Sequence, residues 1–286
     1  MISFLEDDKK KIDEAVSLSI VSSKEEQNKI IEYMRYSALG GKRLRGILTL
    51  ETAKMFGLSS EDVLPFAVAM ECVHAYSLIH DDLPCMDDDD IRRGKPSCHV
   101  AFGEANAVLA GDALLTHAFT VLSECEWGEK YPDRTLKAIR ILSDKAGYRG
   151  MVDGQVLDLE AVEKTVSADE LSDMQKLKTG ALMKAAVLIG AAAVGAEEEL
   201  CRFAEGYADE FGSAFQIVDD LADFYGDYDV LDGNSYVKIH GAEKAKMDAY
   251  LCISRAGSYL YELDKRGYDT GALATLLDYL ICATVK

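Results

Sequence analysis

The chain has 286 residues, of which 49% are apolar, so it can bury one large core or two smaller ones. Its formal net charge of −19 argues against nucleic acid or an anionic membrane surface as a partner. The 7 cysteines include no CxxC pair, and an odd, unpatterned set of cysteines indicates reduced thiols. We therefore expect a cytoplasmic protein.

The sequence shows neither the pattern of a secretory signal nor that of a membrane span. MISFLEDDKK at the N-terminus lacks a basic region followed by an apolar core. The longest apolar run, at residues 181–196, is too short to cross a bilayer and carries Lys184 near its start. We expect no membrane insertion.

Helical periodicity recurs along the whole chain. The first expected helix, KKKIDEAVSLSIV, places Ile12, Val16 and Ile20 on one stripe. The second, EEQNKIIEYMRYSAL, places Ile30, Met34 and Ser37 together. The third opens at a serine followed by acidic residues, and its body over 66–79 is apolar nearly all round, which predicts a buried central helix.

Two more long helices are expected at 167–195 and 197–226, and residues 226–241 form the clearest loop. We see no strand alternation of useful length and no linker rich in Pro, Gly or Ser. The sequence predicts one all-α domain over residues 1–286, with ten or more helices.

An aspartate cluster, IHDDLPCMDDDDIRR, follows the apolar central helix. Pro84 ends the helix after Asp81 and Asp82. Asp87 would lie about 240° from Asp81 on a straight helix, but a break lets the chain return it beside Asp81. Carboxylates held together repel unless a cation lies between them, and oxygen-only ligands suit Mg²⁺. A solvated acidic loop is the alternative.

A second cluster, FQIVDDLADF, repeats this arrangement at the end of another apolar helical stretch. Asp219 and Asp223 share a helix face, Asp220 flanks them, and Gln216 lies one turn earlier. One such cluster is weak evidence, whereas two facing each other across a bundle could hold Mg²⁺ ions with a diphosphate as the remaining ligand.

Basic residues that could line the same site occur in GGKRLRG, RRG and KTG. The candidates are Lys42, Arg43, Arg45, Arg92, Arg93, Lys178 and Thr179. Arginine and lysine are common phosphate ligands, and Gly40 and Gly41 would let the backbone approach an anion closely. His74 lies on the helical stripe of Asp81, although a lone histidine on an apolar helix is also a common core residue.

Together, GGKRLR, ECVHAYSLIHDDLPCMDDDDIRRG, FGEANAVLAGDALLTHAF, KTGAL and FQIVDDLAD resemble the trans-isoprenyl diphosphate synthases, most closely the bacterial farnesyl diphosphate synthase type. The resemblance implies an isoprenoid synthase-type helical bundle with a central apolar cavity, a homodimer, and Mg²⁺, three ions per active site with substrate bound. It also implies a prenyltransferase that condenses isopentenyl diphosphate with dimethylallyl or geranyl diphosphate to give farnesyl diphosphate.

The resemblance also assigns roles to residues. The metal ligands would be Asp81, Asp82, Asp87, Asp219, Asp220 and Asp223. Contacts to the allylic substrate would come from Arg92, Lys178, Thr179 and Gln216, and contacts to isopentenyl diphosphate from Lys42, Arg45, His74 and Arg93. The catalytic residues would be Asp81, Asp82, Asp87, Arg92, Lys178 and Asp219. Tyr76 and Ser77 would set product length, with Tyr76 favouring fifteen carbons.

The sequence departs from this family pattern at two main places. Gly46 stands where the family usually has proline. GDYDVLDGNSYVKIHG is shorter than the family loop, with Gly233 and Asn234 where a Gly-Lys is expected, Val237 in place of proline, and Lys238 as the nearest, offset lysine.

Three alternatives therefore stay open. The shortened loop motivates a catalytically impaired or regulatory synthase subunit that binds diphosphates. The pair His80-Asp81 motivates a metal-dependent phosphohydrolase, which would need more histidine ligands than 5 histidines readily supply. A terpene cyclase would share the fold, but the second aspartate cluster and GGKRLR disfavour it.

Overall fold

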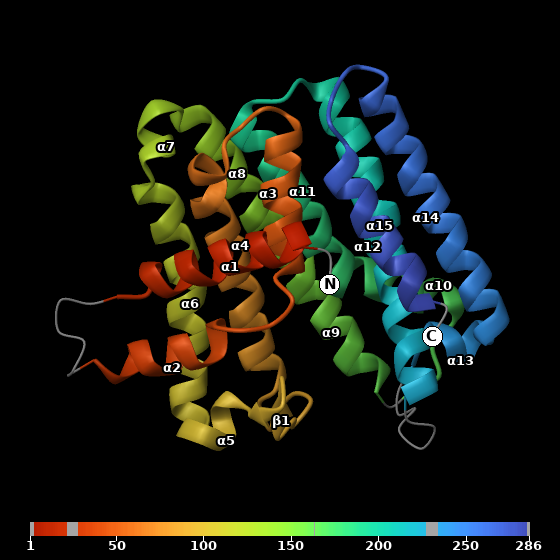
Figure 1. Ribbon diagram of the computed structural model, residues 1–286. Coiled ribbons are helices and arrows are strands. Elements are labelled where there is room, and N and C mark those ends of the chain that lie inside the picture. The colour runs from red at the N-terminus through yellow and green to blue at the C-terminus, as the bar shows by residue number, and fades with distance from the viewer. Residues whose placement is uncertain (1–2, 22–27, 163, 227–233, 285–286) are drawn as a thin grey trace. The chain divides into compact units, whose positions relative to one another are not determined.

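The computed structural model describes residues 3–21, 28–162, 164–226 and 234–284 (Figure 1). These residues are almost wholly helical, as expected, and they group into two compact units. Unit 1 comprises residues 1–54 and 58–139, and unit 2 comprises residues 55–57 and 140–286. The expectation of a single domain stays a prediction, and the units are described separately.

The elements of unit 1 are α1 (Ser3–Ser19), α2 (Lys29–Ala38), α3 (Leu44–Met55), α4 (Ser60–Asp81), β1 (Ile91–Arg92), β2 (Lys95–Pro96), α5 (Cys98–Phe102), α6 (Glu104–Glu124), α7 (Glu126–Lys130) and the first part of α8 (Pro132–Ala146). Those of unit 2 are the rest of α8, α9 (Met151–Ala161), α10 (Ala168–Gln175), the π-helical turn η2 (Lys176–Gly180), α11 (Ala181–Val194), α12 (Glu198–Gly226), α13 (Tyr236–His240), α14 (Ala242–Asp264) and α15 (Gly271–Thr284).

Helix α4 is the central element of unit 1. Ser59 caps its first turn by accepting a hydrogen bond from the backbone N–H of Asp62 at 3.3 Å. The apolar body of α4 is buried and packs against α6 and α1 (Figure 1). The prediction of a buried central helix is confirmed, because a helix that is apolar on nearly all sides must be covered on nearly all sides.

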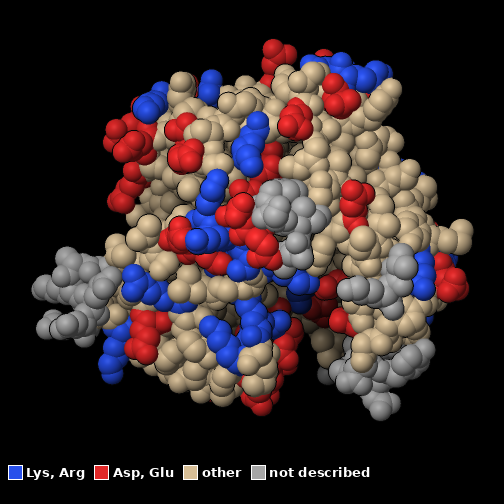
Figure 2. All heavy atoms as spheres, in the orientation of Figure 1, with Lys and Arg blue, Asp and Glu red and all other residues tan. Residues whose placement is uncertain are grey.

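The expected buried stripe of α1 is also confirmed, since Ile12, Val16 and Ile20 are at most 2% exposed. In α2 the prediction was partly wrong. The buried residues are Ile31, Met34 and Ala38 rather than Ile30, Met34 and Ser37. Figure 2 shows basic side chains among acidic ones over α1 and α2, so the net negative charge is not concentrated in this part of the surface.

In unit 2, α12 packs against α14 and α11. The helix expected over 167–195 begins with a capping box between Ser167 and Glu170, but its middle is the π-helical turn η2. Gly195, with φ of 78°, ends α11 in a left-handed conformation that only glycine adopts without strain.

Among the described residues, α4, α6 and Ala168–Val194 are each long and apolar enough to cross a membrane by length and composition alone. In α4 and Ala168–Val194, 67% and 61% of the most apolar 18-residue stretch is buried inside the protein. This burial explains why these two helices are apolar. In α6 only 33% of the corresponding stretch is buried, so this helix keeps an uncovered apolar face.

Candidate active site

The first aspartate cluster lies where α4 ends. The helix stops at Asp81, as expected from Pro84. The backbone N–H of Asp87 donates to the carbonyl of Asp81 at 2.9 Å, so the prediction that the chain returns Asp87 beside Asp81 is confirmed for the backbone. The turn carries several carboxylates, and carboxylate oxygens are ligands of the kind that Mg²⁺ prefers.

Asp82, the last aspartate before Pro84, is buried and paired with an arginine. It is only 2% exposed and accepts hydrogen bonds from Nε of Arg92 at 2.8 Å and from Nη2 of the same guanidinium. Burial raises the pKa of the Asp82 carboxyl, and the hydrogen bonds from Arg92 oppose that rise. The structure therefore pairs an expected metal ligand with an expected substrate contact.

Arg92 and Arg93 lie on a small antiparallel hairpin that the sequence did not reveal. Arg92 in β1 pairs with Lys95 in β2, and Ile91 pairs with Pro96. Arg93 and Gly94 form the turn, with φ of 55° and 74°. Two residues with positive φ are typical of the tight turns that join short antiparallel strands. The hairpin therefore turns two consecutive arginines toward different neighbours.

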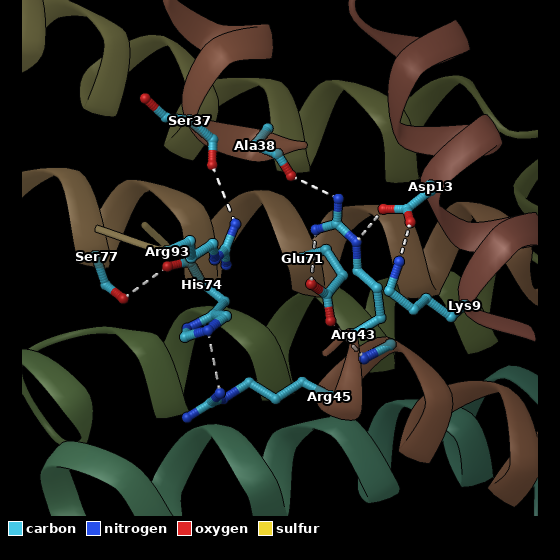
Figure 3. Close-up of polar contacts among 11 residues, drawn as sticks. Lys9, Asp13, Ser37, Ala38, Arg43, Arg45, Glu71, His74, Ser77 and Arg93 are labelled. Atoms are coloured by element: carbon cyan, nitrogen blue, oxygen red, sulfur yellow. Dashed lines mark hydrogen bonds and ion pairs between the residues drawn. The ribbon is translucent and has the colours of Figure 1, made fainter. Parts of the chain in front are cut away.

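A group of cationic side chains surrounds His74 on α4 (Figure 3). Nη1 of Arg45, at the start of α3, lies 3.2 Å from Nε2 of His74. Burial, followed by the nearby charges of Arg45 and Arg93, lowers the pKa of His74 well below its usual range. This shift favours the neutral imidazole, whose Nε2 can accept a hydrogen bond from Arg45, because a guanidinium has only donors. Guanidinium groups gathered in this way favour an anion between them.

Gly41 provides the close backbone approach expected of the GGKRLRG loop. Its φ is 90°, and a Cβ at this position would lie only 2.8 Å from Cζ of Arg93. Any larger residue would push the Arg93 guanidinium away. Nη1 of Arg93 donates to the carbonyl of Ser37 at 3.4 Å, and Lys42 is exposed on the same loop. The four expected contacts to isopentenyl diphosphate thus all belong to unit 1.

The second aspartate cluster lies near the end of α12 in unit 2. Asp219 and Asp223 are exposed and one turn apart on the helix. Asp220 is 8% exposed, and its carboxylate accepts from the side chains of Gln175 and Gln216 at 3.1 and 2.9 Å and from the backbone N–H of Tyr236 at 2.7 Å. Burial raises its pKa, and these hydrogen bonds oppose the rise.

Lys178 and Thr179 lie on the π-helical turn η2, and α9 fixes this turn. Nζ of Lys178 is 2.5 Å from Oδ2 of Asp158. One turn earlier on α9, a Cβ at Gly154 would lie 2.2 Å from the backbone nitrogen of Lys178. Sequence analysis did not identify Gly154, Asp158 or Tyr236. A glycine within a regular helix was the one available signal, since it often marks a close backbone approach.

The residues expected to set product length lie near the end of α4. Tyr76 is 7% exposed, and its ring lies 5.8 Å from that of His80 in an edge-to-face arrangement. The Ser77 hydroxyl donates to the carbonyl of His74 at 2.9 Å. His80 packs over Gly111 of α6, with Nε2 3.1 Å from the carbonyl of Val108, so it is a helix-packing residue.

The loop expected over 226–241 is only partly described, because residues 227–233, including Gly233, lie outside the described residues. The prediction was wrong for 236–240, which form α13. Ser235 caps this helix by accepting from the backbone N–H of Lys238 at 3.2 Å, and the Tyr236 hydroxyl donates to Asp248 at 2.7 Å. These contacts stabilise a short helix that carries Lys238, although the segment lacks a clear apolar stripe.

The donor set fits a hard divalent cation, because both clusters offer carboxylate oxygens and neither offers sulfur. Within the described ranges, no three His, Cys, Asp or Glu side chains converge closely enough to hold an ion by themselves. An ion bound at either cluster would therefore need further ligands, and phosphate oxygens are the usual ones for Mg²⁺.

Comparisons with known proteins agree with this geometry. The family model described as polyprenyl synthetase matches residues 27–236. The chain is 43% identical over 284 residues to farnesyl diphosphate synthase of Escherichia coli, covering 95% of each chain, and 42% identical over 228 residues to that of Bacillus subtilis, covering 79% of this chain and 76% of the relative. The crystal structure of an FPP/GFPP synthase from Zymomonas mobilis superposes with a TM-score of 0.87 at 36% identity, covering 97% of each chain.

Both the sequence match and the structural match span most of the chain, and they include the aspartate clusters and the basic loop. The chain belongs to the polyprenyl synthetase family and has its all-α isoprenoid synthase fold.

Proposed function

We propose that this chain is a prenyltransferase that joins isopentenyl diphosphate to dimethylallyl diphosphate, and then to geranyl diphosphate, to give farnesyl diphosphate. The observation that carries the proposal is the group of Arg45, His74 and Arg93 in unit 1, a site whose positive charge suits a diphosphate. Relatives named farnesyl diphosphate synthase, at 43% and 42% identity, support the same activity.

Magnesium is the proposed cofactor, with three ions per active site when substrate is bound. When bound, Mg²⁺ neutralises the negative charge that builds on the leaving diphosphate. The proposed ligands are Asp81, Asp82, Asp87, Asp219, Asp220 and Asp223. Hydrogen bonds already engage Asp82 and Asp220, so these two would also orient Arg92 and Gln216.

The chain's own residues support a dissociative reaction. Arg92, Lys178, Thr179 and Gln216 would bind the allylic diphosphate, whose C–O bond breaks with the electron pair leaving on the diphosphate. Lys42, Arg45, His74 and Arg93 would hold isopentenyl diphosphate, whose double bond forms the new C–C bond with the allylic cation. The proton then lost from the isopentenyl unit goes to the released diphosphate, so no strongly basic side chain is needed. The apolar body of α4 would exclude water from the cation.

Tyr76 is the proposed determinant of product length. It is buried on α4 one helical turn and one residue before Asp81, so its ring would limit the depth available to a growing chain. The proposed product has fifteen carbons. Ser77 occupies the next position, and its small side chain stays hydrogen-bonded to its own helix.

A homodimer in the cytoplasm is the proposed assembly and location. The uncovered face of α6 supports the homodimer. Val108 and Leu109 on this face are 40% and 56% exposed, and only 33% of the most apolar stretch of the helix is buried. A second copy of the chain would cover these residues.

The test is an incubation of purified protein with Mg²⁺, isopentenyl diphosphate and either allylic substrate, with products separated by chain length. A fifteen-carbon product from both substrates is expected. Magnesium-dependent diphosphate binding without product would refute the prenyltransferase and favour the regulatory subunit considered for the shortened loop.

A further inference from the structure

One guanidinium of the basic loop GGKRLRG points into the protein instead of toward the candidate substrate site. Arg43 is 3% exposed and has a φ of 56°, a left-handed conformation that is strained for arginine. Its Nε donates to Asp13 at 2.7 Å, its Nη1 to Glu71 at 3.0 Å and its Nη2 to the carbonyl of Ala38 at 2.6 Å (Figure 3). Every nitrogen of the guanidinium therefore has a partner inside unit 1.

These partners come from three different helices. Asp13 lies on α1, Ala38 ends α2 and Glu71 lies in the middle of α4. Lys9 donates to the second carboxylate oxygen of Asp13 at 2.7 Å, so two cations and two carboxylates balance. A buried charge that is fully hydrogen-bonded holds its position strongly, because moving it leaves an uncompensated charge behind. Arg43 thus ties the loop to α1, α2 and α4.

Glu71 also holds the other end of the loop. One of its carboxylate oxygens accepts from Arg43, and the other accepts from the backbone N–H of Gly46 at 2.7 Å. A Cβ at Gly46 would lie 3.1 Å from both Glu71 and Ile12, so glycine permits this close approach. A proline at this position would lack the N–H that Glu71 binds.

The two anchored residues lie directly beside the two proposed diphosphate contacts of the loop. Lys42 precedes Arg43 and is exposed, and Arg45 precedes Gly46 and reaches His74. Fixing the backbone at 43 and 46 therefore fixes the starting points of both cationic side chains.

We propose that Arg43, held by Glu71 and Asp13, is a positioning residue that fixes Lys42 and Arg45 for isopentenyl diphosphate. The proposal rests on the proposed prenyltransferase function, and it assigns Arg43 no contact with substrate. Because the anchors belong to this loop and not to η2 or α12, the effect should fall on isopentenyl diphosphate and spare the allylic substrate.

The test compares Arg43→Lys and Glu71→Gln with the wild type in steady-state condensation, with KM measured for each substrate separately. Lysine keeps the charge but cannot reach three partners, and glutamine keeps the shape of Glu71. We expect KM for isopentenyl diphosphate to rise roughly 10- to 100-fold, because the groups that contact this substrate are displaced. KM for geranyl diphosphate should change less than about twofold.

Lys54→Met is the matched structural control. Lys54 on α3 pairs with Glu51 at 2.5 Å and with Asp8 of α1 at 3.8 Å, so its loss removes another link between α1 and α3 without touching the loop. We expect Lys54→Met to shift urea unfolding while leaving both KM values unchanged. If Lys54→Met raised KM for isopentenyl diphosphate as much as Arg43→Lys does, a general loss of stability would explain the effect and the proposal would be wrong.

A double variant separates positioning from packing. In the Lys42→Gln background, Arg43→Lys should raise KM for isopentenyl diphosphate by less than it does in the wild type, because one of the groups it positions is gone. Equal rises in both backgrounds, or equal changes in the two substrates' KM values, would overturn the proposal. A wild type that forms no product would instead refute the proposed function.

Discussion

Helix α9 approaches the π-helical turn η2 so closely that Gly154 is a critical residue for Lys178. A Cβ at Gly154 would lie 2.2 Å from the backbone nitrogen of Lys178 and 2.6 Å from its Cα. Both atoms belong to the main chain, so no side-chain rotation can relieve the overlap. Gly154→Ala therefore has to move η2 away from α9.

The size of this movement follows from the geometry. Restoring an ordinary van der Waals contact of about 3.4 Å requires a displacement of about 1.2 Å. Overpacking of this kind costs about 1–3 kcal/mol of unfolding free energy. The same shift would lengthen the contact of Lys178 with Asp158, now 2.5 Å, and would displace Lys178 from an allylic diphosphate. A 1 Å misplacement can lower activity about 100-fold.

The assay measures urea unfolding together with kcat and KM for geranyl diphosphate. Gly180→Ala is the control on the same turn, because a Cβ there would meet its nearest atom at 3.7 Å and alanine favours helix. We expect Gly154→Ala to be destabilised and to lose activity toward geranyl diphosphate, and Gly180→Ala to keep its stability. Unchanged kcat and KM in a Gly154→Ala protein that is destabilised would refute the link between α9 and Lys178.

Two further predictions concern unit 1. Tyr76→Ala should yield products longer than fifteen carbons, because it removes a buried ring from α4, and should cost about 3 kcal/mol of stability; an unchanged product distribution by chromatography would contradict the role of Tyr76. Burial, and then a hydrogen bond to Asp8, raise the pKa of Glu51 to about 7, compared with 4.5 in the unfolded chain. The stability that Glu51 contributes is therefore complete below pH 4.5 and is lost as the pH rises through 7. Glu51→Gln should therefore show a smaller fall in unfolding free energy between pH 4.5 and 7 than the wild type, measured by urea unfolding; parallel pH profiles would contradict this.

Local rules made the helices of unit 1 predictable. The serine cap of α4, its apolar body and its end before Pro84 each depend on residues within one or two turns. The break at Pro84 was also enough to predict that Asp87 returns toward Asp81. The buried face of α2 was misplaced by one residue on either side of Met34, because a short helix with mixed apolar and polar residues leaves its rotation to tertiary packing.

Roles that depend on distant partners could not be predicted. The motif GGKRLRG offers Lys42, Arg43 and Arg45 as cations, and the family resemblance gives a substrate contact to Lys42 and Arg45 but no role to Arg43. Only the positions of Asp13 and Glu71 show that Arg43 points inward. The pairing of Asp82 with Arg92 and the contacts of Gln175 and Tyr236 with Asp220 were equally hidden, because they join residues 10 to 45 positions apart. The π-helical turn η2 has no clear composition signal, since its backbone follows from its packing on α9.

The most direct test of the central claim is whether both aspartate clusters act on one allylic diphosphate. The measurement is calorimetric binding of geranyl thiolodiphosphate, which cannot readily ionise, to wild type, Asp81→Asn, Asp219→Asn and the double variant, with Mg²⁺ and with EDTA. We predict that binding requires Mg²⁺ and that each single variant binds about tenfold or more weakly than the wild type. The double variant should bind more weakly still, but its loss of affinity should be smaller than the product of the two single losses, since the proposed function has both clusters bind one diphosphate. Binding that persists in EDTA, or a single variant that binds as the wild type does, would contradict the account.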